Sequence, residues 1–339
     1  MRDTDYRPLR RRERRPRPGD WIIRSRIWFY VAALLVLLAF RFIPGLQPDP
    51  RDVDPKPPIE REPAPVVLSG TDLAPNLIPQ LVEEYRAQYP WIVPELLPGG
   101  TRKALEDLIN GRSDLAILNR LPTAEERTII SSRVDSLESY SIAMGGIAVL
   151  AGKEGGPDSV TTGVLRAWFG GGRAPGAGLP PADPAASPAP KLYVPDPNLG
   201  LWDAFASQLG VAAEPPEGLV WLADERAVAQ AVGADPGSIG IASTLSLPAD
   251  LDELGARLVP VRGDTTSRAV LPYRGQIARG DYPLFHYLYV AMRPGRASAA
   301  TGFVTFVYSG RGQRLVQHQG FVPARQTARI IQLVSKPLG

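Results

Sequence analysis

Residues 66–118 alternate between short continuous apolar runs and stretches in which apolar residues recur at helical spacing. Val66–Ser69, Trp91–Leu97 and Asp114–Leu118 are short apolar runs of the kind that form buried strands. Between these runs, apolar residues recur at helical spacing along 75–88 and again along 101–109. The resulting βαβαβ order predicts a mainly parallel sheet covered by helices, so the fold class is α/β.

A second α/β set follows the long apolar run Tyr140–Gly152. The predicted strands are Lys191–Val194, Leu219–Leu222, Ser238–Ser243, Leu258–Val261 and Tyr287–Met292. The predicted helices are Val164–Phe169, Leu199–Leu209, Glu225–Val232, Ala299–Tyr308, Arg311–Gln317 and Thr327–Val334. Residues 170–190 consist mostly of Ala, Pro and Gly, which predicts a disordered loop.

The first 64 residues divide into three parts of contrasting polarity. Residues 1–26 contain ten arginines and four acidic residues, whereas Ile27–Phe40 contains no charge. Cytoplasmic flanks collect basic residues, so 1–26 is a cytoplasmic head, 27–43 a transmembrane helix and 44–64 a proline-rich linker. The apolar core is also short enough for a signal peptide, but no small-x-small cleavage site follows it. We therefore expect an uncleaved anchor in the bilayer of the cell (inner) membrane, with the body periplasmic or extracellular.

Charge and composition exclude several classes of function for this body. Without residues 1–41, 27 basic and 31 acidic residues remain, and no basic stripe indicates nucleic-acid binding. No cysteine is present, which excludes disulfides and thiolate metal sites. The two histidines, His286 and His318, have no partner visible from sequence, and Glu125 and Glu126 fall on a predicted helix surface. The sequence predicts no enzyme activity, metal or cofactor.

Five segments in the expected order resemble the phosphate-binding subgroup of the periplasmic solute-binding proteins, which have the type II periplasmic binding protein fold. The segments are SGTDLAPNLIPQLVEEYRAQYP, PGGTRKALEDLINGRSDLAILNRLPTAEE, YSIAMGGIAVLAGKEG, VTTGVLRAWFGG, and YPLFHYLYVAM followed by SGRGQRLVQHQGFVPA. The resemblance implies two α/β lobes that face each other across a ligand cleft. Lobe one would comprise 65–145 plus 284–339, and lobe two 146–283.

The resemblance also implies which residues line the cleft. The candidate ligand-binding residues are Thr71, Asp72, Gly100, Thr101, Asn119, Arg120, Gly200 and Trp202. Thr101 is expected first to cap its helix and second to donate to an anion, while the spacing of Trp202 with Phe205 also fits core packing. The family's arginine, serine and threonine in lobe two are replaced by Pro195, Leu199 and Leu201.

These departures leave two functions open. The first is a membrane-anchored solute-binding protein that takes a small anion such as phosphate to an ABC-type permease or another membrane protein. The second is a degenerate binding fold that carries no ligand and acts as an extracytoplasmic protein-interaction or sensing module. The retained Gly99-Gly100-Thr101 favours the first, and the eroded donor set of lobe two favours the second.

Overall fold

The computed structural model describes most of the body of the chain. The described residues are 62–134, 136–170, 190–295, 298–324 and 329–331, together with Tyr30 and Leu34. The predicted head and linker, the remainder of the predicted transmembrane helix and nearly all of the predicted loop 170–190 therefore lie outside the described residues. Within the described part, no helix combines the length and apolarity needed to cross a membrane.

Lobe one contains a mixed sheet in which parallel strands are followed by antiparallel ones. Its strands are β1 (Ala64–Ser69), β2 (Ile92–Leu97), β3 (Leu115–Leu118), β11 (Phe285–Met292) and the first half of β4 (Leu137–Gly152). β1 pairs in parallel with β2 and β3, and β11 runs antiparallel between β3 and β4. The short strands β12 (Val322–Pro323) and β13 (Arg329–Ile331) pair with the other edge of β4.

The predicted helix Thr327–Val334 is wrong at its centre, because Arg329–Ile331 form the strand β13. This segment pairs antiparallel with Leu137–Ser139 of β4. Ile330 and Ile331 are β-branched residues, which suit a pleated surface, and the open edge of β4 supplies backbone partners. Pairing with a distant strand thus determined the conformation of a segment whose local pattern favoured a helix.

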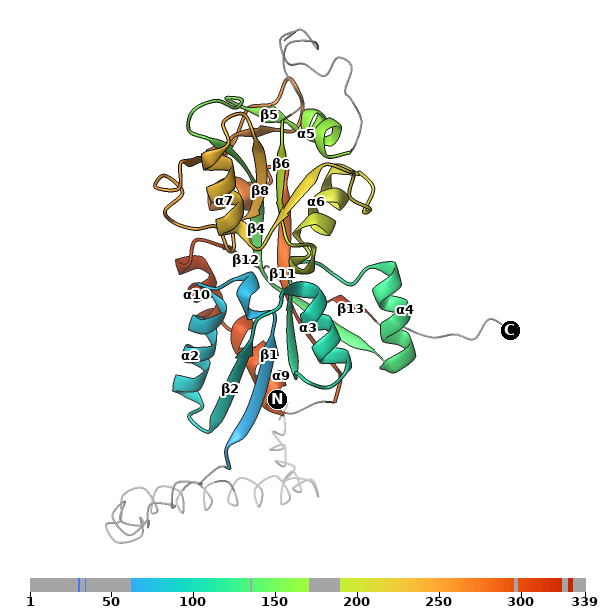
Figure 1. The fold of residues 1–339 in the computed structure, drawn as a ribbon. Coiled ribbons are helices and arrows are strands. Elements are labelled where there is room, and N and C mark those ends of the chain that lie inside the picture. The colour runs from blue at the N-terminus through green and yellow to red at the C-terminus, as the bar shows by residue number, and fades with distance from the viewer. Residues whose placement is uncertain are drawn as a thin grey trace, which may run out of the picture. The chain divides into compact units, whose positions relative to one another are not determined.

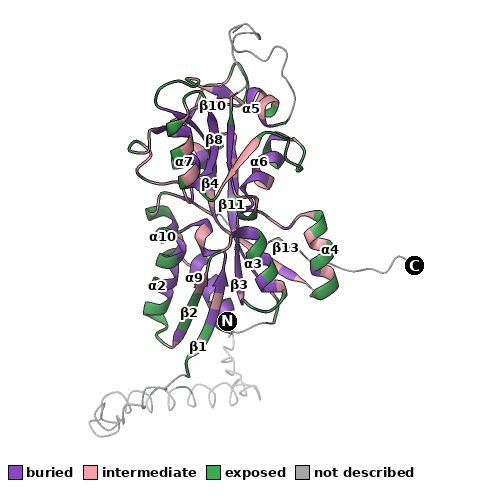
Figure 2. Cartoon of the chain, in the orientation of Figure 1, coloured by how far each residue is buried: buried purple, intermediate pink, exposed green. Residues whose placement is uncertain are grey.

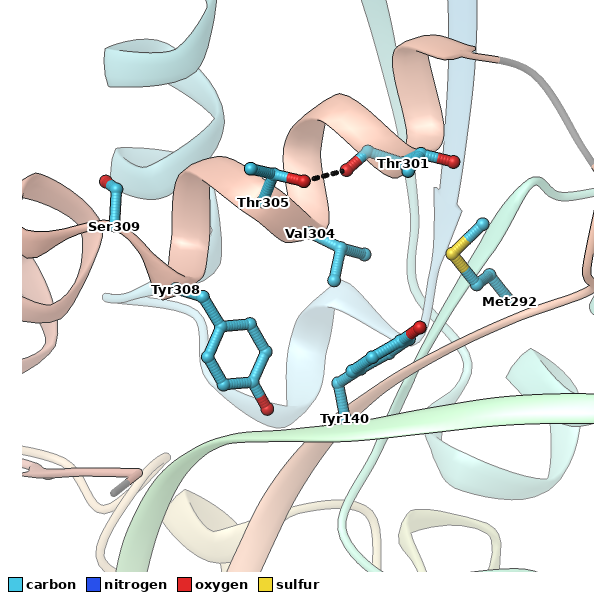
Figure 3. Close-up of a pocket in the computed structure, with 7 residues that line it drawn as sticks. All are labelled: Tyr140, Met292, Thr301, Val304, Thr305, Tyr308 and Ser309. Carbon is cyan, nitrogen blue, oxygen red and sulfur yellow. Dashed lines mark hydrogen bonds between the residues drawn. The ribbon is translucent and has the colours of Figure 1, made fainter. Parts of the chain in front are cut away.

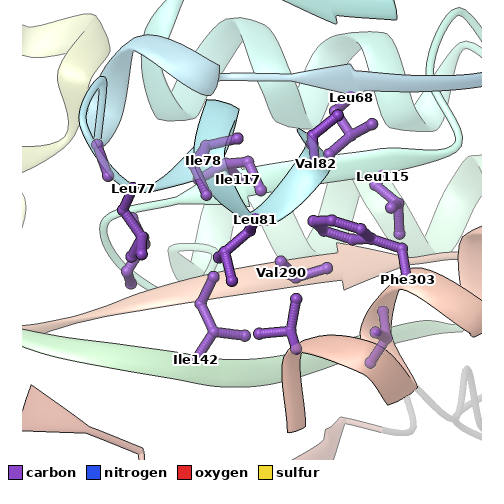
Figure 4. Close-up of a cluster of buried hydrophobic side chains, with 14 of the residues drawn as sticks. Leu68, Leu77, Ile78, Leu81, Val82, Leu115, Ile117, Ile142, Val290 and Phe303 are labelled. Carbon is purple, nitrogen blue, oxygen red and sulfur yellow. The ribbon is translucent and has the colours of Figure 1, made fainter. Parts of the chain in front are cut away.

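Helices cover both faces of the lobe-one sheet (Figure 1). They are η1 (Thr71–Leu73), α2 (Ile78–Gln88), α3 (Gly100–Ile109), α4 (Ala124–Arg133), α9 (Ser298–Tyr308) and α10 (Gly310–His318). α2 and α9 enclose one apolar core with Leu81 and Phe303 at its centre (Figure 4). α3 packs on the opposite face, where Leu105 and Leu108 meet Leu118. These apolar stripes recur every three to four residues, which explains why each helix buries one side.

Lobe two repeats the arrangement with a smaller sheet. Its elements are β5 (Val160–Thr161), α5 (Thr162–Phe169), β6 (Leu192–Pro195), η2 (Pro197–Leu199), α6 (Leu201–Leu209), β7 (Leu219–Leu222), α7 (Glu225–Ala234), β8 (Ile239–Ser243), β9 (Ala256–Val259), β10 (Val261–Arg262) and α8 (Arg274–Arg279). β6 pairs in parallel with β7 and β8, and β10 pairs with β5. Phe205, Trp202 and Ile241 belong to its main core.

β4 joins the two lobes as a single strand of 16 residues. Its first half pairs with β11, and its second half, from Ile147 onward, pairs with β8 and β9. The residues of this second half are buried, and buried residues also fill the cores of the two lobes on either side (Figure 2). The predicted α/β fold with two lobes is therefore confirmed, and the long apolar run Tyr140–Gly152 is the connection between them.

Candidate functional site

The N-terminus of α3 already holds a carboxylate of the protein itself. The side chain of Asp72, in η1, accepts hydrogen bonds at Oδ1 from the backbone N–H groups of Gly99 and Gly100, both at 3.1 Å. The first N–H groups of a helix lack partners within the helix and lie at the positive end of its dipole. An external anion would use these same groups. Asp72 therefore occupies the position that such an anion would need.

Thr101 and Asn119 bind the backbone of lobe two. The Thr101 hydroxyl donates to the carbonyl oxygen of Leu199 at 2.9 Å and accepts from the backbone N–H of Asn119 at 3.0 Å. The side-chain amide of Asn119 donates to the same Leu199 oxygen at 3.3 Å. Both side chains are buried, with exposed fractions of 0% and 1%. Two donors of lobe one are thus used by one oxygen of lobe two.

The expected capping role of Thr101 is not observed. α3 begins at Gly100, and Gly99 is its N-cap without a side-chain hydrogen bond. The carboxylate of Asp72 supplies the hydrogen bonds that a capping side chain would otherwise provide. The hydroxyl of Thr101 is consequently free to contact the other lobe.

Two glycines allow the lobes to touch at this point. Gly100 has a φ of 71°, and a Cβ atom there would lie 2.6 Å from the carbonyl oxygen of Asn198. Gly200 has a φ of 78°, and a Cβ atom there would lie 2.9 Å from Oγ1 of Thr101. A side chain at either position would therefore collide with the opposite lobe, and glycine is the residue that tolerates both the space and the backbone conformation.

Arg120 forms ion pairs with one carboxylate of each lobe. Its Nε donates to Oδ2 of Asp203 in lobe two at 2.6 Å, and its Nη1 and Nη2 donate to Glu126 at 2.6 and 2.9 Å. Only 8% of its side chain is exposed. Burial opposes the charged form, but the hydrogen bonds and charge of Glu126, followed by those of Asp203, outweigh it and raise the pKa of Arg120. The half-exposed Arg102 lies 3.7 Å from Asp203.

The electrostatic balance at this contact disfavours an additional anion. Two arginines, Arg102 and Arg120, face three carboxylates, Asp72, Glu126 and Asp203. The formal charge is therefore 2 − 3 = −1 for this set. The donors exist, but their charge is already compensated within the protein.

Thr71 and Trp202 contribute to packing. The Thr71 hydroxyl donates to the carbonyl oxygen of Leu97 at 3.3 Å and is largely buried. Trp202 is 2% exposed, lies against Phe169 and Phe205, and donates from Nε1 to the carbonyl oxygen of Ala213 at 2.7 Å. The structure therefore brings Asp72, Thr101 and Asn119 to the interlobe contact but places Trp202 in the core of lobe two.

Sequence reasoning missed the acidic partners of Arg120. Glu126 was expected to be solvated, whereas its side chain is 23% exposed and forms a bidentate ion pair with Arg120. The capping box between Thr123 and Glu126 is readable from their spacing and could have indicated that Glu126 turns back toward residue 120. Asp203 carried no such signal, because it meets Arg120 only through the contact between lobes.

A buried serine and histidine also meet near the crossing strands. Oγ of Ser243 and Nε2 of His286 form a hydrogen bond of 2.8 Å, and burial lowers the pKa of His286 to about 4. A nucleophilic serine needs an accessible position and a histidine that a third group orients. Both residues are almost fully buried, so this pair is not arranged for catalysis.

Two hollows in the described body lie away from the predicted cleft residues. One has a volume of about 450 Å³ and lies between α9 and β4, where Tyr140, Met292 and Tyr308 face one another (Figure 3). The other has a volume of about 550 Å³ and is lined by residues of β4, β11 and β12. Across the described residues, no group of three or more His, Cys, Asp or Glu side chains could hold a metal ion.

Comparisons with known proteins agree with this architecture. The family described as "PBP superfamily domain" matches residues 57–311. No curated protein matches the chain. A phosphate-bound structure named as a phosphate ABC transporter substrate-binding protein from Clostridium perfringens is 17% identical, with a TM-score of 0.63, covering 77% of this chain and 100% of that one. An ABC-type phosphate transport receptor from Vibrio cholerae is 16% identical, with a TM-score of 0.59 and the same coverage of 77% and 100%.

At these identities the structural similarity establishes only the fold. The family match covers three quarters of the chain and therefore establishes the family. The two lobes, the long crossing strand and the donors at the start of α3 are all features that this fold brings together. The chain belongs to the PBP superfamily.

Proposed function

We propose that this protein is an anchored extracytoplasmic binding-protein fold that no longer carries an anion and acts as an interaction or sensing module. The proposal rests on one observation: the carboxylate of Asp72 accepts the two N–H groups, those of Gly99 and Gly100, that an anion would take. The anchor and the extracytoplasmic location are part of the proposal, because they rest on the charge pattern of the first 43 residues.

The remaining donors support the same conclusion. A phosphate would have to displace Asp72, separate Thr101 from the Leu199 carbonyl and compete with Glu126 and Asp203 for Arg120. Hydrogen bonds to charged groups contribute about 1.5–3 kcal/mol each, and a neutral one such as Thr101–Leu199 contributes about 0.5–1.5 kcal/mol. Together these displacements remove a sizeable part of what phosphate binding would provide. A body whose lobes are held in contact by its own groups offers a constant surface to a partner protein.

Anion delivery to a permease is the second candidate. It is supported by the intact two-lobed framework and by the fold shared with phosphate transport receptors. In this case the lobes would open and Asp72 would leave the N-terminus of α3 when the ligand arrives. The two candidates differ in whether the unmodified protein binds a small anion.

The test is a thermal-unfolding screen of the full-length protein against phosphate and sulfate, with Asp72→Ala measured in parallel. We expect no shift for the unmodified protein, because its N–H groups are occupied. Asp72→Ala frees these groups, so sulfate or phosphate should partly restore the stability that this variant loses. A ligand present at about 100 times its dissociation constant stabilises by about 2.7 kcal/mol. A stabilisation of that size by phosphate or sulfate in the unmodified protein would instead establish anion binding.

A further inference from the structure

A tight turn of lobe two, here named the latch turn (residues 243–246), contributes to the core of lobe one. It follows β8 and is closed by a hydrogen bond of 3.2 Å from the backbone N–H of Ser246 to the carbonyl oxygen of Ser243. Its Leu245 is 1% exposed and belongs to the apolar core that α2 and α9 enclose in lobe one. The latch turn therefore joins the lobes by burying one of its own side chains in the opposite lobe.

Hydrogen bonds attach the latch turn to both strands that cross between the lobes. The backbone N–H of Thr244 donates to the carbonyl oxygen of Gly146 in β4 at 2.9 Å, and its hydroxyl accepts from the N–H of Gly146 at 2.8 Å. Oγ of Ser243 forms a hydrogen bond of 2.8 Å with Nε2 of His286 in β11 and accepts from the backbone N–H of Leu245 at 3.1 Å. A displacement of the latch turn would therefore alter both the hinge strands and the contact with lobe one.

A buried carboxyl group lies beside the latch turn. Glu225, the first residue of α7, is 4% exposed. Burial raises its pKa from 4.5 to about 7, and the charge of Asp224 acts in the same direction. Its own backbone, the side chain of Ser246 and the backbone of Ser243 favour the charged form and offset the burial only in part. Glu225 therefore interacts with two residues of the latch turn and changes its charge near neutral pH.

Other titratable groups of α7 and of the strands packed against it bond elsewhere. Arg226 pairs with Asp250, and their closest atoms are 2.6 Å apart. Tyr193 of β6 donates to Asp235 at 2.8 Å, and Asp235 is the C-cap residue at the far end of α7. Arg257 of β9 donates to backbone carbonyl oxygens of the loop that follows β4. These groups thus bond to partners outside the latch turn.

We propose that the latch turn holds the lobes together while Glu225 is protonated and releases them when Glu225 ionises. A carboxylate at this buried position needs water. The helix α7 is fixed by its own backbone hydrogen bonds, whereas the latch turn lies at the end of a strand and its Ser246 is half-buried. Water therefore reaches Glu225 most easily when the latch turn moves, and this movement withdraws Leu245 from lobe one.

Such a release makes the relative position of the lobes depend on the proton concentration outside the ligand cleft. It requires neither the membrane anchor nor the loss of the anion, so it goes beyond the function proposed above. A module whose lobes separate in this way would respond to pH.

The experiment measures the open and closed populations of the full-length protein by single-molecule FRET between about pH 5 and pH 8. The chain has no cysteine, so Ala87→Cys on α2 and Gln230→Cys on α7, both at exposed positions, place one dye on each lobe. The buffer contains neither phosphate nor sulfate, which keeps the result separate from anion binding. The open-to-closed ratio of the labelled protein is divided by that of the same protein with Glu225→Gln, because the amide stays neutral at every pH.

This quotient should rise as the pH increases from about 5 to about 7 and should then level off. Opening lowers the pKa of Glu225 from about 7 toward its ordinary value of 4.5, so the closed state loses its advantage between these two values. With a fully hydrated carboxyl group in the open state, the rise is about tenfold per pH unit. Burial lowers the pKa of His286 to about 4, and this residue is present in both proteins, so its own titration cancels in the quotient.

Glu253→Gln is the matched control, because Glu253 is an exposed glutamate of lobe two, and it should retain the pH response of the unmodified protein. Leu245→Ala should populate the open conformation already at about pH 5, since it removes the side chain that the latch turn places in lobe one. The proposal is overturned if the quotient does not change with pH or if Glu253→Gln removes the response as Glu225→Gln does. It is also overturned if Leu245→Ala leaves the lobes as closed as in the unmodified protein.

Discussion

Gly200→Ala should disturb the contact between the lobes, and Gly210→Ala provides its internal control. Both glycines flank α6, Gly200 as its N-cap with φ 78° and Gly210 as its C-cap with φ 66°. Alanine in this left-handed region costs roughly 1–2 kcal/mol at either site. At Gly200 the new Cβ would also lie 2.9 Å from Thr101 Oγ1, whereas at Gly210 it meets nothing within 4 Å.

The difference between the two variants therefore measures the interlobe contact. Overpacking of a close contact costs about 1–3 kcal/mol, so Gly200→Ala should be less stable than Gly210→Ala by that amount. A protein of this size loses about 2–4 °C of melting temperature per kcal/mol. Thermal unfolding measures the stability, and small-angle X-ray scattering shows whether the lobes separate to relieve the collision. Equal melting temperatures and equal radii of gyration would refute the direct contact between Gly200 and Thr101.

Further predictions concern the buried ionisable groups and the N-terminus. Burial lowers the pKa of His286 from 6.5 to about 4, so the unfolded chain binds more protons and this residue should remove about 3 kcal/mol of stability as the pH falls from 7 to 4. Burial raises the pKa of Glu225 from 4.5 to about 7, so this residue adds stability as the pH falls over the same window. The measured quantity is therefore the difference in free energy of urea unfolding between the unmodified protein and His286→Asn. A difference that does not depend on pH would contradict the assignment to His286. Arg120→Met should cost about 3 kcal/mol because it leaves two carboxylates without their buried partner. Arg226→Met, at an ion pair whose side chains are 52% and 30% exposed, should cost clearly less, and similar chemical-denaturation midpoints for both variants would argue against the buried pairing. N-terminal sequencing of the mature protein should find the segment 27–43 retained, and a start after residue 40 would show that the anchor is cleaved.

Hydrophobic periodicity along the chain determines most of the fold. The apolar runs at β1, β2 and β3 and the stripes of α2 and α3 are local patterns, and each matches the element observed. Periodicity succeeds here because burial of one face is a property of neighbouring residues along the chain. It fails at Arg329–Ile331, where the edge of a distant strand decides the conformation.

The state of the candidate site was decided by contacts between residues far apart in sequence. Thr101 meets Leu199 across 98 positions, and Arg120 meets Asp203 across 83. The sequence indicated which donors were retained and that lobe two had lost its own. It did not indicate that Asp72 would accept the N–H groups of α3, because both capping and anion binding use the same backbone donors. Only the tertiary structure, which brings an internal carboxylate and an internal carbonyl to those donors, distinguishes an occupied site from an available one.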